Sequence, residues 1–295
     1  MTMAAIDIQP DNKELAHKWI SQISGLVSPP DICIKVFELI EANAPLADIG
    51  DIISQDPNLA VRLLKIVNSP YYSFASRIDT ISRATSVIGI RELSSLLISI
   101  SAVKTFSTIP IDLVNIDTFW RHSIYTGLIA RQLAQECHIL HPERLFVAGL
   151  LHDIGSLVIY SQAPEESKEI LTKAAGNEQS VFNNEVETFG FSHSYIGGIL
   201  LEAWKIPETL RESIAFHHEP ELATDATREA SILHIAEALA NRSEIGAFCE
   251  QADIEIQIEP YAWETIKLKE ADLDLDDLIG NAGLQFAEMA QVLSA

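Results

Sequence analysis

The residues of this chain most able to do chemistry are five histidines and one aspartate. His152 and Asp153 are adjacent, and the histidines around them are widely spaced. Imidazole and carboxylate ligands suit Zn, Fe, Mn or Ni, and a site that mixes both types leaves room for bound water. The sequence therefore predicts a site for one or two metal ions. Its expected ligands are His122, His152, Asp153, His193, His217 and His218.

Adjacency poses a geometric problem for two of these pairs. Neighbouring residues on a helix point about 100° apart. His152 and Asp153 therefore cannot both face one ion from a straight helix, and the doublet His217-His218 has the same difficulty. A hydrogen-bonded polar core without metal would suit the same spacing, so both interpretations stay open at this stage.

The remaining histidines and the cysteines carry no comparable pattern. A single histidine on an apolar helix is usually a satisfied core or surface residue, and we expect this of His17, His138, His141 and His234. The three cysteines form no C-x-x-C pair, which argues against a disulfide framework or a cysteine-rich zinc site. They are Cys33, Cys137 and Cys249.

Helix start and stop signals recur along the chain and predict an all-α fold. Asp56-Pro57 is one such start, with a capping residue before a proline at the first helical position. The predicted helices cover residues 32–42, 58–67, 91–105, 117–137, 143–160 and 225–241, with further starts at Ser192 and Pro207. Ile254–Ile258 alternates like a strand but has no hairpin partner, so we expect a single extended segment.

We expect two packed helical lobes, with a seam near Pro110 where a proline interrupts the helical pattern. Residues 1–25 form an N-terminal segment, and residues 26–106 form the N-terminal lobe. Residues 107–245 form a second lobe that holds every candidate ligand. Residues 246–295 form an acidic, helical C-terminal extension.

The chain is strongly acidic, with 42 acids against 20 bases and a net charge of −22. Such a field repels nucleic acid and anionic membranes, and no local basic patch is evident along the sequence. Residues 241–295 hold 12 acids and 3 bases. This stretch is a solvated face or a docking surface for a basic partner.

No apolar run approaches the roughly 18 residues that span a bilayer, and the polar N-terminus does not resemble a signal peptide, so we expect a cytoplasmic protein.

Several motifs together give a family resemblance. The first half shows Asp56-Pro57, Leu63-Leu64-x-x-x-Asn68-Ser69 and Ala84-x-x-x-Ile88-Gly89. The second shows Gly149 to Gly155 around His152, Glu185-x-x-x-Phe189-Gly190-x-x-His193, Leu201-x-x-Trp204-x-Ile206-Pro207 and Ile214-x-x-His217-His218-x-Pro220. From Leu26 to Pro220 the chain resembles the HDOD domain, an HD-related output domain of bacterial signalling. The resemblance implies a second lobe built as an HD-type helical bundle.

The chain departs from the related HD-GYP phosphodiesterases, which cleave cyclic di-GMP, at four positions. Ser156 stands where those enzymes have a lysine, and Glu219-Pro220 leads into no Gly-Tyr-Pro signature. Thr118 stands where some have a glutamate ligand. Glu237 is the nearest match to their closing aspartate and is the seventh candidate ligand. Without the lysine the phosphate of a substrate lacks a preorganised cation, which is usually a large catalytic contribution.

Two functions remain, and the departures favour the first. The first is a non-catalytic signalling module that binds a partner protein, with any metal structural or regulatory and with Glu185, Trp204 and Pro207 supporting the site. The second is a metal-dependent phosphohydrolase of a nucleotide or cyclic dinucleotide, in which Asp153 helps to orient a metal-bound water. It would need a cation from elsewhere, and the candidates are Lys205, Arg211 and Arg121.

Overall fold

The computed structural model of the protein describes residues 8–23, 31–69, 71–72, 74, 76–107, 113–249 and 258–293. Every regular element within these ranges is a helix, so the predicted all-α class is confirmed. The extended segment expected at Ile254–Ile258 lies, apart from its last residue, outside the described residues, and so does the proline of the expected seam.

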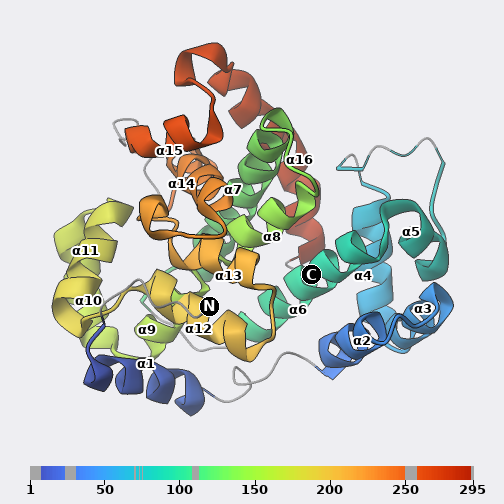
Figure 1. Ribbon diagram of the computed structural model, residues 1–295, viewed down its shortest axis with the longest axis horizontal. Helices are drawn as coiled ribbons and strands as arrows, with labels where there is room; N and C mark the ends of the chain where they lie inside the picture. The colour runs from blue at the N-terminus through green and yellow to red at the C-terminus, as the bar shows by residue number, and fades with distance from the viewer. Residues whose placement is uncertain are drawn as a thin grey trace.

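The N-terminal lobe consists of five helices, of which three pack against α6 (Figure 1). They are α2 (Asp31–Glu41), α3 (Leu46–Ser54), α4 (Pro57–Val67), α5 (Ile81–Ile88) and α6 (Ile90–Phe106). As predicted, Asp56 caps α4, and its carboxylate accepts hydrogen bonds from the backbone N–H groups of Asn58 and Leu59 at 3.0 and 3.1 Å. Helix α6 is buried over most of its surface because it contacts α2, α4 and α5 within the lobe and α8 beyond it.

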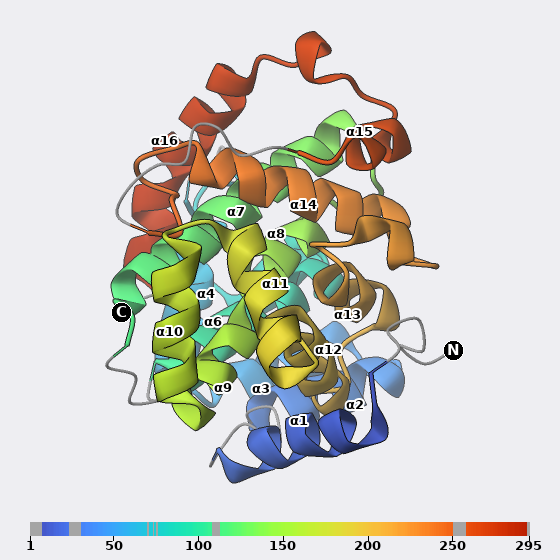
Figure 2. The same ribbon diagram turned by 90° about the vertical axis from the view of Figure 1, so that its left-hand side faces the viewer.

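The second lobe surrounds the long helix α7 (Ile116–Glu136), which packs along α8 (Glu143–Leu151) and α14 (Thr227–Asn241). Figure 2 shows α14 lying over α7 at one end of the molecule, with the α10–α11 pair toward the viewer. The other elements are α9 (Ile154–Gln162), α10 (Pro164–Ala174), α11 (Glu178–Phe189), α12 (His193–Ala203), α13 (Glu208–Ala215) and the 3₁₀ turn η1 (Pro220–Leu222).

Helices from both ends of the chain close onto these lobes. Helix α1 (Pro10–Gln22) packs on α9 and α12, with the Trp19 ring 5.2 Å from Phe189 and 5.3 Å from Phe191. After α15 (Pro260–Ile266) and the 3₁₀ turn η2 (Glu270–Asp272), α16 (Leu275–Leu293) contacts α7 of the second lobe and α4 and α6 of the first. Helix α16 therefore ties the two lobes together.

Two sequence expectations need correction. The segment Glu143–Gln162 is long and apolar enough to cross a membrane by composition, but 89% of its apolar 18-residue window is buried, as in the core of a globular fold. The helix expected from Asp225 begins instead at Thr227. Glu212 supports this start, because its carboxylate accepts the backbone N–H groups of Asp225 and Ala226 at 2.9 and 2.7 Å, immediately before the helix.

Candidate metal centre

The helix predicted over residues 143–160 is broken at the residues that matter most. Helix α8 ends at Leu151, His152 caps it, and Asp153, with φ −101° and ψ 5°, leaves helical geometry before α9 begins at Ile154. The 100° offset of a straight helix therefore does not apply, and both side chains face the same interior point. Gly155 follows directly, where a Cβ would lie 2.0 Å from the His193 carbonyl oxygen. Glycine thus allows α12 to approach this break closely.

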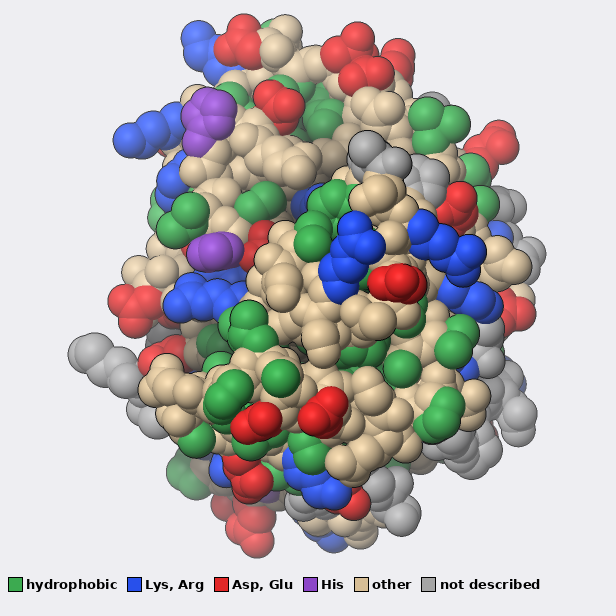
Figure 3. Space-filling view, turned by 90° about the vertical axis from the view of Figure 1, so that its right-hand side faces the viewer, with side chains coloured by type: hydrophobic (Ala, Val, Ile, Leu, Met, Phe, Trp, Pro, Cys, Tyr) green, Lys and Arg blue, Asp and Glu red, His purple; other side chains and the backbone are tan. Residues whose placement is uncertain are grey.

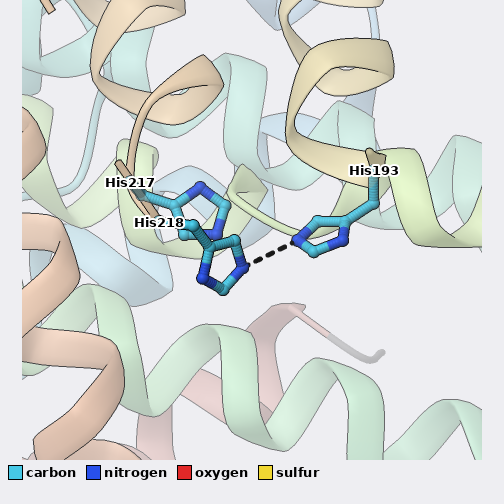
Figure 4. Close-up of side chains that lie close together, drawn as sticks. All are labelled: His193, His217 and His218. Atoms are coloured by element: carbon cyan, nitrogen blue, oxygen red, sulfur yellow. Dashed lines mark hydrogen bonds between the residues drawn. The ribbon is translucent and has the colours of Figure 1, made fainter. Parts of the chain in front are cut away.

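The structure brings all seven predicted ligands together from five parts of the second lobe. His122 comes from the middle of α7, His193 begins α12, and Glu237 comes from α14. The doublet after α13 also lies outside regular helix, which removes its geometric difficulty, and Figure 4 shows both rings on the side of His193. All seven side chains are buried, with residue exposures between 0% and 6%.

Four of the five imidazoles are oriented in the same way. Each has its Nδ1 beside an acceptor, so Nδ1–H donates and Nε2 faces the interior, which is how second-sphere groups prepare histidine ligands. The acceptors are the Gly246 carbonyl for His122 (2.6 Å), the Gly149 carbonyl for His152 (2.7 Å), the Ile214 carbonyl for His217 (2.6 Å) and the Glu185 carboxylate for His193 (2.6 Å).

The distances between these inward nitrogens suit a shared ion. The Nε2 atoms of His122 and His152 are 3.3 Å apart, and those of His193 and His218 are 3.1 Å apart. Without metal, the raised pKa values of His122 and His193 place a proton on one nitrogen of each pair, which then donates to the other. Two ligands each about 2.1 Å from one metal also lie about 3.0–3.4 Å apart. The Nε2 atom of His217 is buried without any hydrogen-bond partner. The donor set therefore fits a bound metal.

Asp153 lies between two groups of histidines. Its Oδ2 is 3.2 Å from Nε2 of His152, and its Oδ1 is 3.2 Å from Nε2 of His193. His122 lies on the Oδ2 side at 3.9 Å, and His217 lies on the Oδ1 side at 4.0 Å. One carboxylate facing two sets of nitrogens is suited to bridge two ions.

Glu178, an eighth candidate ligand, was missed in the sequence. It begins α11 and is 5% exposed. Its Oε1 lies 3.2 Å from Nε2 of His122, but the two atoms are not aligned as a hydrogen bond. Its other carboxylate oxygen accepts a hydrogen bond from Asn241. Together with His122, His152 and Asp153 it forms one group whose ligand atoms all lie within 4.8 Å of one another.

Glu185 supports the site, as predicted, by accepting both the His193 ring N–H at 2.6 Å and the His193 backbone N–H at 2.8 Å. His234 is a satisfied core residue, as expected. Its Nδ1 donates to the His217 carbonyl at 2.9 Å, and its Nε2 accepts the Glu259 backbone N–H at 3.2 Å.

Burial and mutual charge divide the cluster into charged and neutral groups when no metal is bound. Burial lowers the pKa of His122, but Glu178 and Asp153 together raise it to about 9. Burial also lowers the pKa of His193, but Glu185 and Asp153 together outweigh it and raise that pKa to about 10. Burial and then the neighbouring imidazoles hold the pKa values of His217 and His218 well below the ordinary value.

The carboxylates divide in the same way. Burial would raise the pKa of Asp153, but the surrounding histidines, led by His152, hold it well below its usual range. Burial and then Glu178 and Asp153 raise the pKa of Glu237 well above its ordinary value. Asp153 is therefore ready to bind a cation, whereas Glu237 must lose a proton to do so.

The opening to this cluster is small and acidic. A cavity of about 40 Å³ is lined by Glu178, Gln179, His218, His234, Glu237, Ala238 and Asn241. Two larger cavities, of about 470 and 300 Å³, meet at Asn115 and Thr118 near the start of α7. The smaller of these is mainly apolar and is lined in part by Phe248, whose ring stands edge-on to His122 at 6.0 Å.

The structure places none of the three candidate cations at the cluster carboxylates. Arg211 bonds to the Ile206 carbonyl at 3.0 Å and pairs with Glu202 at 3.2 Å, Lys205 is exposed, and Arg121 contacts Thr118 at 3.4 Å. Within the described part of the chain, the ion pairs of Asp153, Glu178, Glu185 and Glu237 are all made with histidines.

Comparison with known proteins agrees with the sequence and the geometry. The model of the HDOD domain family matches residues 26–220. An uncharacterized protein of Treponema pallidum is 29% identical over 218 residues, which cover 72% of this chain and 41% of that relative. The chain thus spans well under half the length of that relative.

Two solved structures share the fold at identities too low to show more than that. An HDOD domain protein of unknown function from Geobacter sulfurreducens has a TM-score of 0.74 and 24% identity, covering 96% of this chain and 97% of that one. A suspected phosphohydrolase from Shewanella amazonensis has a TM-score of 0.71 and 21% identity, covering 94% and 97%.

Proposed function

The chain belongs to the HDOD domain family, and on that premise we propose that it is a non-catalytic signalling module of the bacterial cytoplasm. It acts by binding a partner protein. Its buried cluster of histidines and carboxylates holds one or two ions of Zn, Fe, Mn or Ni as a structural or regulatory centre.

The small, acidic opening of the cluster is the observation that carries this proposal. A cavity of about 40 Å³ has room for water beside an ion, whereas pockets that hold drug-sized ligands measure about 300–1,000 Å³. Glu178 and Glu237 line this opening. The carboxylate of Glu178 disfavours the approach of a phosphate diester, which is itself an anion, whereas Glu237, whose pKa is raised, adds no repulsion without metal.

The lack of a nearby cation supports the same conclusion. Ser156 occupies the position where the phosphodiesterases have a lysine, and it is buried with 2% of its surface exposed. Phosphoryl transfer depends mainly on positioning and on charge that stabilises the transition state. A cluster whose described ion pairs involve histidines alone supplies ligands for a metal but no lysine or arginine for the substrate.

A metal in this centre would supply folding energy, because ligands gathered from five segments cannot be preformed in an unfolded chain. The Asp153 carboxylate, with one oxygen toward His152 and the other toward His193, also suits a two-metal hydrolase. The phosphohydrolase is therefore the alternative that the experiment must exclude.

The test combines metal analysis with an activity assay on the full chain purified without chelator or histidine tag. We expect one or two metal ions per chain and no hydrolysis of bis(p-nitrophenyl) phosphate or cyclic di-GMP by protein loaded with Zn, Fe, Mn or Ni. Turnover that disappears in the His152→Ala/Asp153→Ala variant would refute the non-catalytic proposal and establish the hydrolase.

The same double variant separates the metal centre from partner binding. We expect it to lose metal and thermal stability while its affinity for a partner protein stays within about twofold, because the two residues are buried and surface contacts carry recognition. A folded variant that loses its partner would contradict this picture.

A further inference from the structure

The charge of this acidic protein is distributed very unevenly. Residues 57–91 carry five bases and one acid, a net charge of +4, while the rest of the chain carries 15 bases and 41 acids, a net charge of −26. The five bases are Arg62, Lys65, Arg77, Arg83 and Arg91. Because they are widely spaced, they do not form a recognisable basic cluster in the sequence.

The fold gathers these bases, here called the basic face, on neighbouring elements of the N-terminal lobe. Two come from α4, one from α5, one from the segment between them and one from the start of α6, and these three helices contact one another. Figure 3, which views the molecule from the side of this lobe, shows Lys and Arg side chains gathered near its centre around an acidic one.

Most of the basic face has no acidic partner within the described residues. Arg83 lies 4.0 Å from Asp79, and both side chains are exposed, so this pair is weak. Among described residues, no carboxylate lies within 4.0 Å of the other four bases. Four of the five bases are exposed, and Arg62 is partly buried. The basic face thus offers several cations to an outside anion.

Apolar side chains are interleaved with these cations. Val61 is 52% exposed and Val87 is 45% exposed. Each stands four residues from a base on its own helix, Lys65 or Arg83, and therefore shares that base's side of the helix. Phe74, between the two helices, is 38% exposed. A surface that mixes cations with exposed apolar groups is suited to contact a protein rather than ions alone.

We propose that the basic face is the docking surface for an acidic segment of a partner protein that also carries apolar side chains. This inference rests on the proposed partner-binding function and names its site and the chemistry of the partner. Recognition combines salt-sensitive attraction, which speeds association, with burial of Val61, Phe74 and Val87.

The limits of the basic face favour a protein segment over nucleic acid. Helix α4 has 11 residues and is therefore about 16 Å long, whereas duplex DNA carries a charge every 1.7 Å or so along its whole length. A duplex longer than the face would continue over the rest of the protein, which is acidic on balance and repels it. A short acidic peptide segment, by contrast, fits within the basic face. A second copy of this chain is disfavoured by mutual repulsion at −22 each.

The experiment measures binding of a fluorescent peptide of Glu and Leu, about 15 residues long and amphipathic as a helix, at about 0.15 M salt. A Lys/Leu peptide and a DNA duplex are the comparison probes. The face variant is Lys65→Glu/Arg83→Glu. The control is Lys13→Glu/Lys168→Glu, which makes the same change in net charge at exposed helix positions elsewhere.

We expect the Glu/Leu peptide to bind the wild-type protein and the control alike, and the face variant about tenfold more weakly, as expected for the loss and reversal of two surface contacts. The variant Arg77→Gln/Arg91→Gln, checked by circular dichroism, repeats the test if the first does not fold. Absence of peptide binding at about 1 mM, equal weakening in the control, or tighter binding of DNA would each overturn the proposal.

These outcomes are separable from those of the proposed function. Phosphodiesterase turnover would refute the non-catalytic function and leave the basic face intact. Failure of the peptide to bind would remove the docking face and leave the metal centre and the absence of turnover unaffected.

Discussion

Hydrogen bonds at the level of single residues decide what the histidines can do. His122, His152, His193 and His217 each have Nδ1 beside an acceptor, so their rings enter the cluster with Nε2 foremost. Three of the acceptors are backbone carbonyls, which do not titrate. The fold therefore fixes which ring nitrogen faces the cluster, while the pH decides whether that nitrogen of His122 and His193 carries a proton when no metal is bound.

Glu178 provides the sharpest test at this scale. We expect Glu178→Ala to weaken metal binding by at least about tenfold, because even the partners of metal ligands typically contribute that much, and its Oε1 lies 3.2 Å from Nε2 of His122. Metal content and titration with Zn²⁺ would measure the effect. Glu169→Ala, at an exposed position of α10, is the control and should bind metal normally. Equal affinities in the two variants would remove Glu178 from the site.

The sequence identified most of this cluster because its histidines fall in recognisable local motifs. It missed Glu178 because that residue follows the helix cap Asn177, where an acid is expected simply for its favourable interaction with the helix dipole. Only the packing of α11 against the cluster distinguishes it from an ordinary first-turn acid. Whether the gathered residues hold metal stays a prediction.

The break between α8 and α9 is the decisive feature among the secondary-structure elements. Sequence reasoning predicted one helix over residues 143–160 because apolar residues continue on both sides of the break. The register is interrupted where Asp153 leaves the helix and where α12 packs against Gly155. Such tertiary contacts have no local signal, whereas caps such as Asp56 and Ser192 are local and were predicted correctly.

Gly155→Ala tests this break. Its Cβ would lie 2.0 Å from the His193 carbonyl and 2.8 Å from the Gly197 nitrogen, both backbone atoms that cannot move aside cheaply. We expect a loss of about 1–3 kcal/mol in unfolding free energy, with reduced metal content because His193 is displaced. Urea denaturation measures the first effect and elemental analysis the second.

The control is a glycine with free space around it. Gly280 lies on the exposed side of α16, and its added Cβ would meet nothing within 4 Å. We expect Gly280→Ala to stabilise the protein by up to about 1 kcal/mol, as alanine does in a helix. A Gly155→Ala protein as stable as the wild type would show that α9 and α12 are less tightly packed than described.

The pH dependence of stability belongs to the whole molecule. Without metal, the pKa values of His122 and His193 rise from 6.5 to about 9 and about 10 on folding. Folding then takes up protons, so this stabilisation is complete below about pH 6.5 and is lost as the pH rises toward 9–10. With metal bound, both histidines must be deprotonated already.

We therefore expect the midpoint of thermal unfolding to fall between pH 7 and 9 for metal-free protein and to fall less for metal-loaded protein. Differential scanning calorimetry of the two forms measures this. Titrating groups outside the cluster contribute nearly equally to both forms, so the difference between the two pH profiles reports on the cluster. Parallel curves would show that these histidines do not change their protonation on folding.

The distribution of charge is likewise visible only in the whole molecule. The sequence showed no basic patch because the five bases of the basic face are spread over residues 62–91. The contacts of α4, α5 and α6 bring them together. The overall acidity and the all-helical class were evident beforehand, since both depend on composition and local pattern.

The family match ends at residue 220, yet two parts of the cluster come later in the chain. Glu237 lies beside His217 and His218, and the Gly246 carbonyl holds the ring of His122. The stretch that the family model matches therefore does not include every residue of the centre. A gene fusion joined at residue 220 would inherit all five histidines but neither Glu237 nor the carbonyl that orients His122, so the crossover point alone would decide whether the cluster is complete.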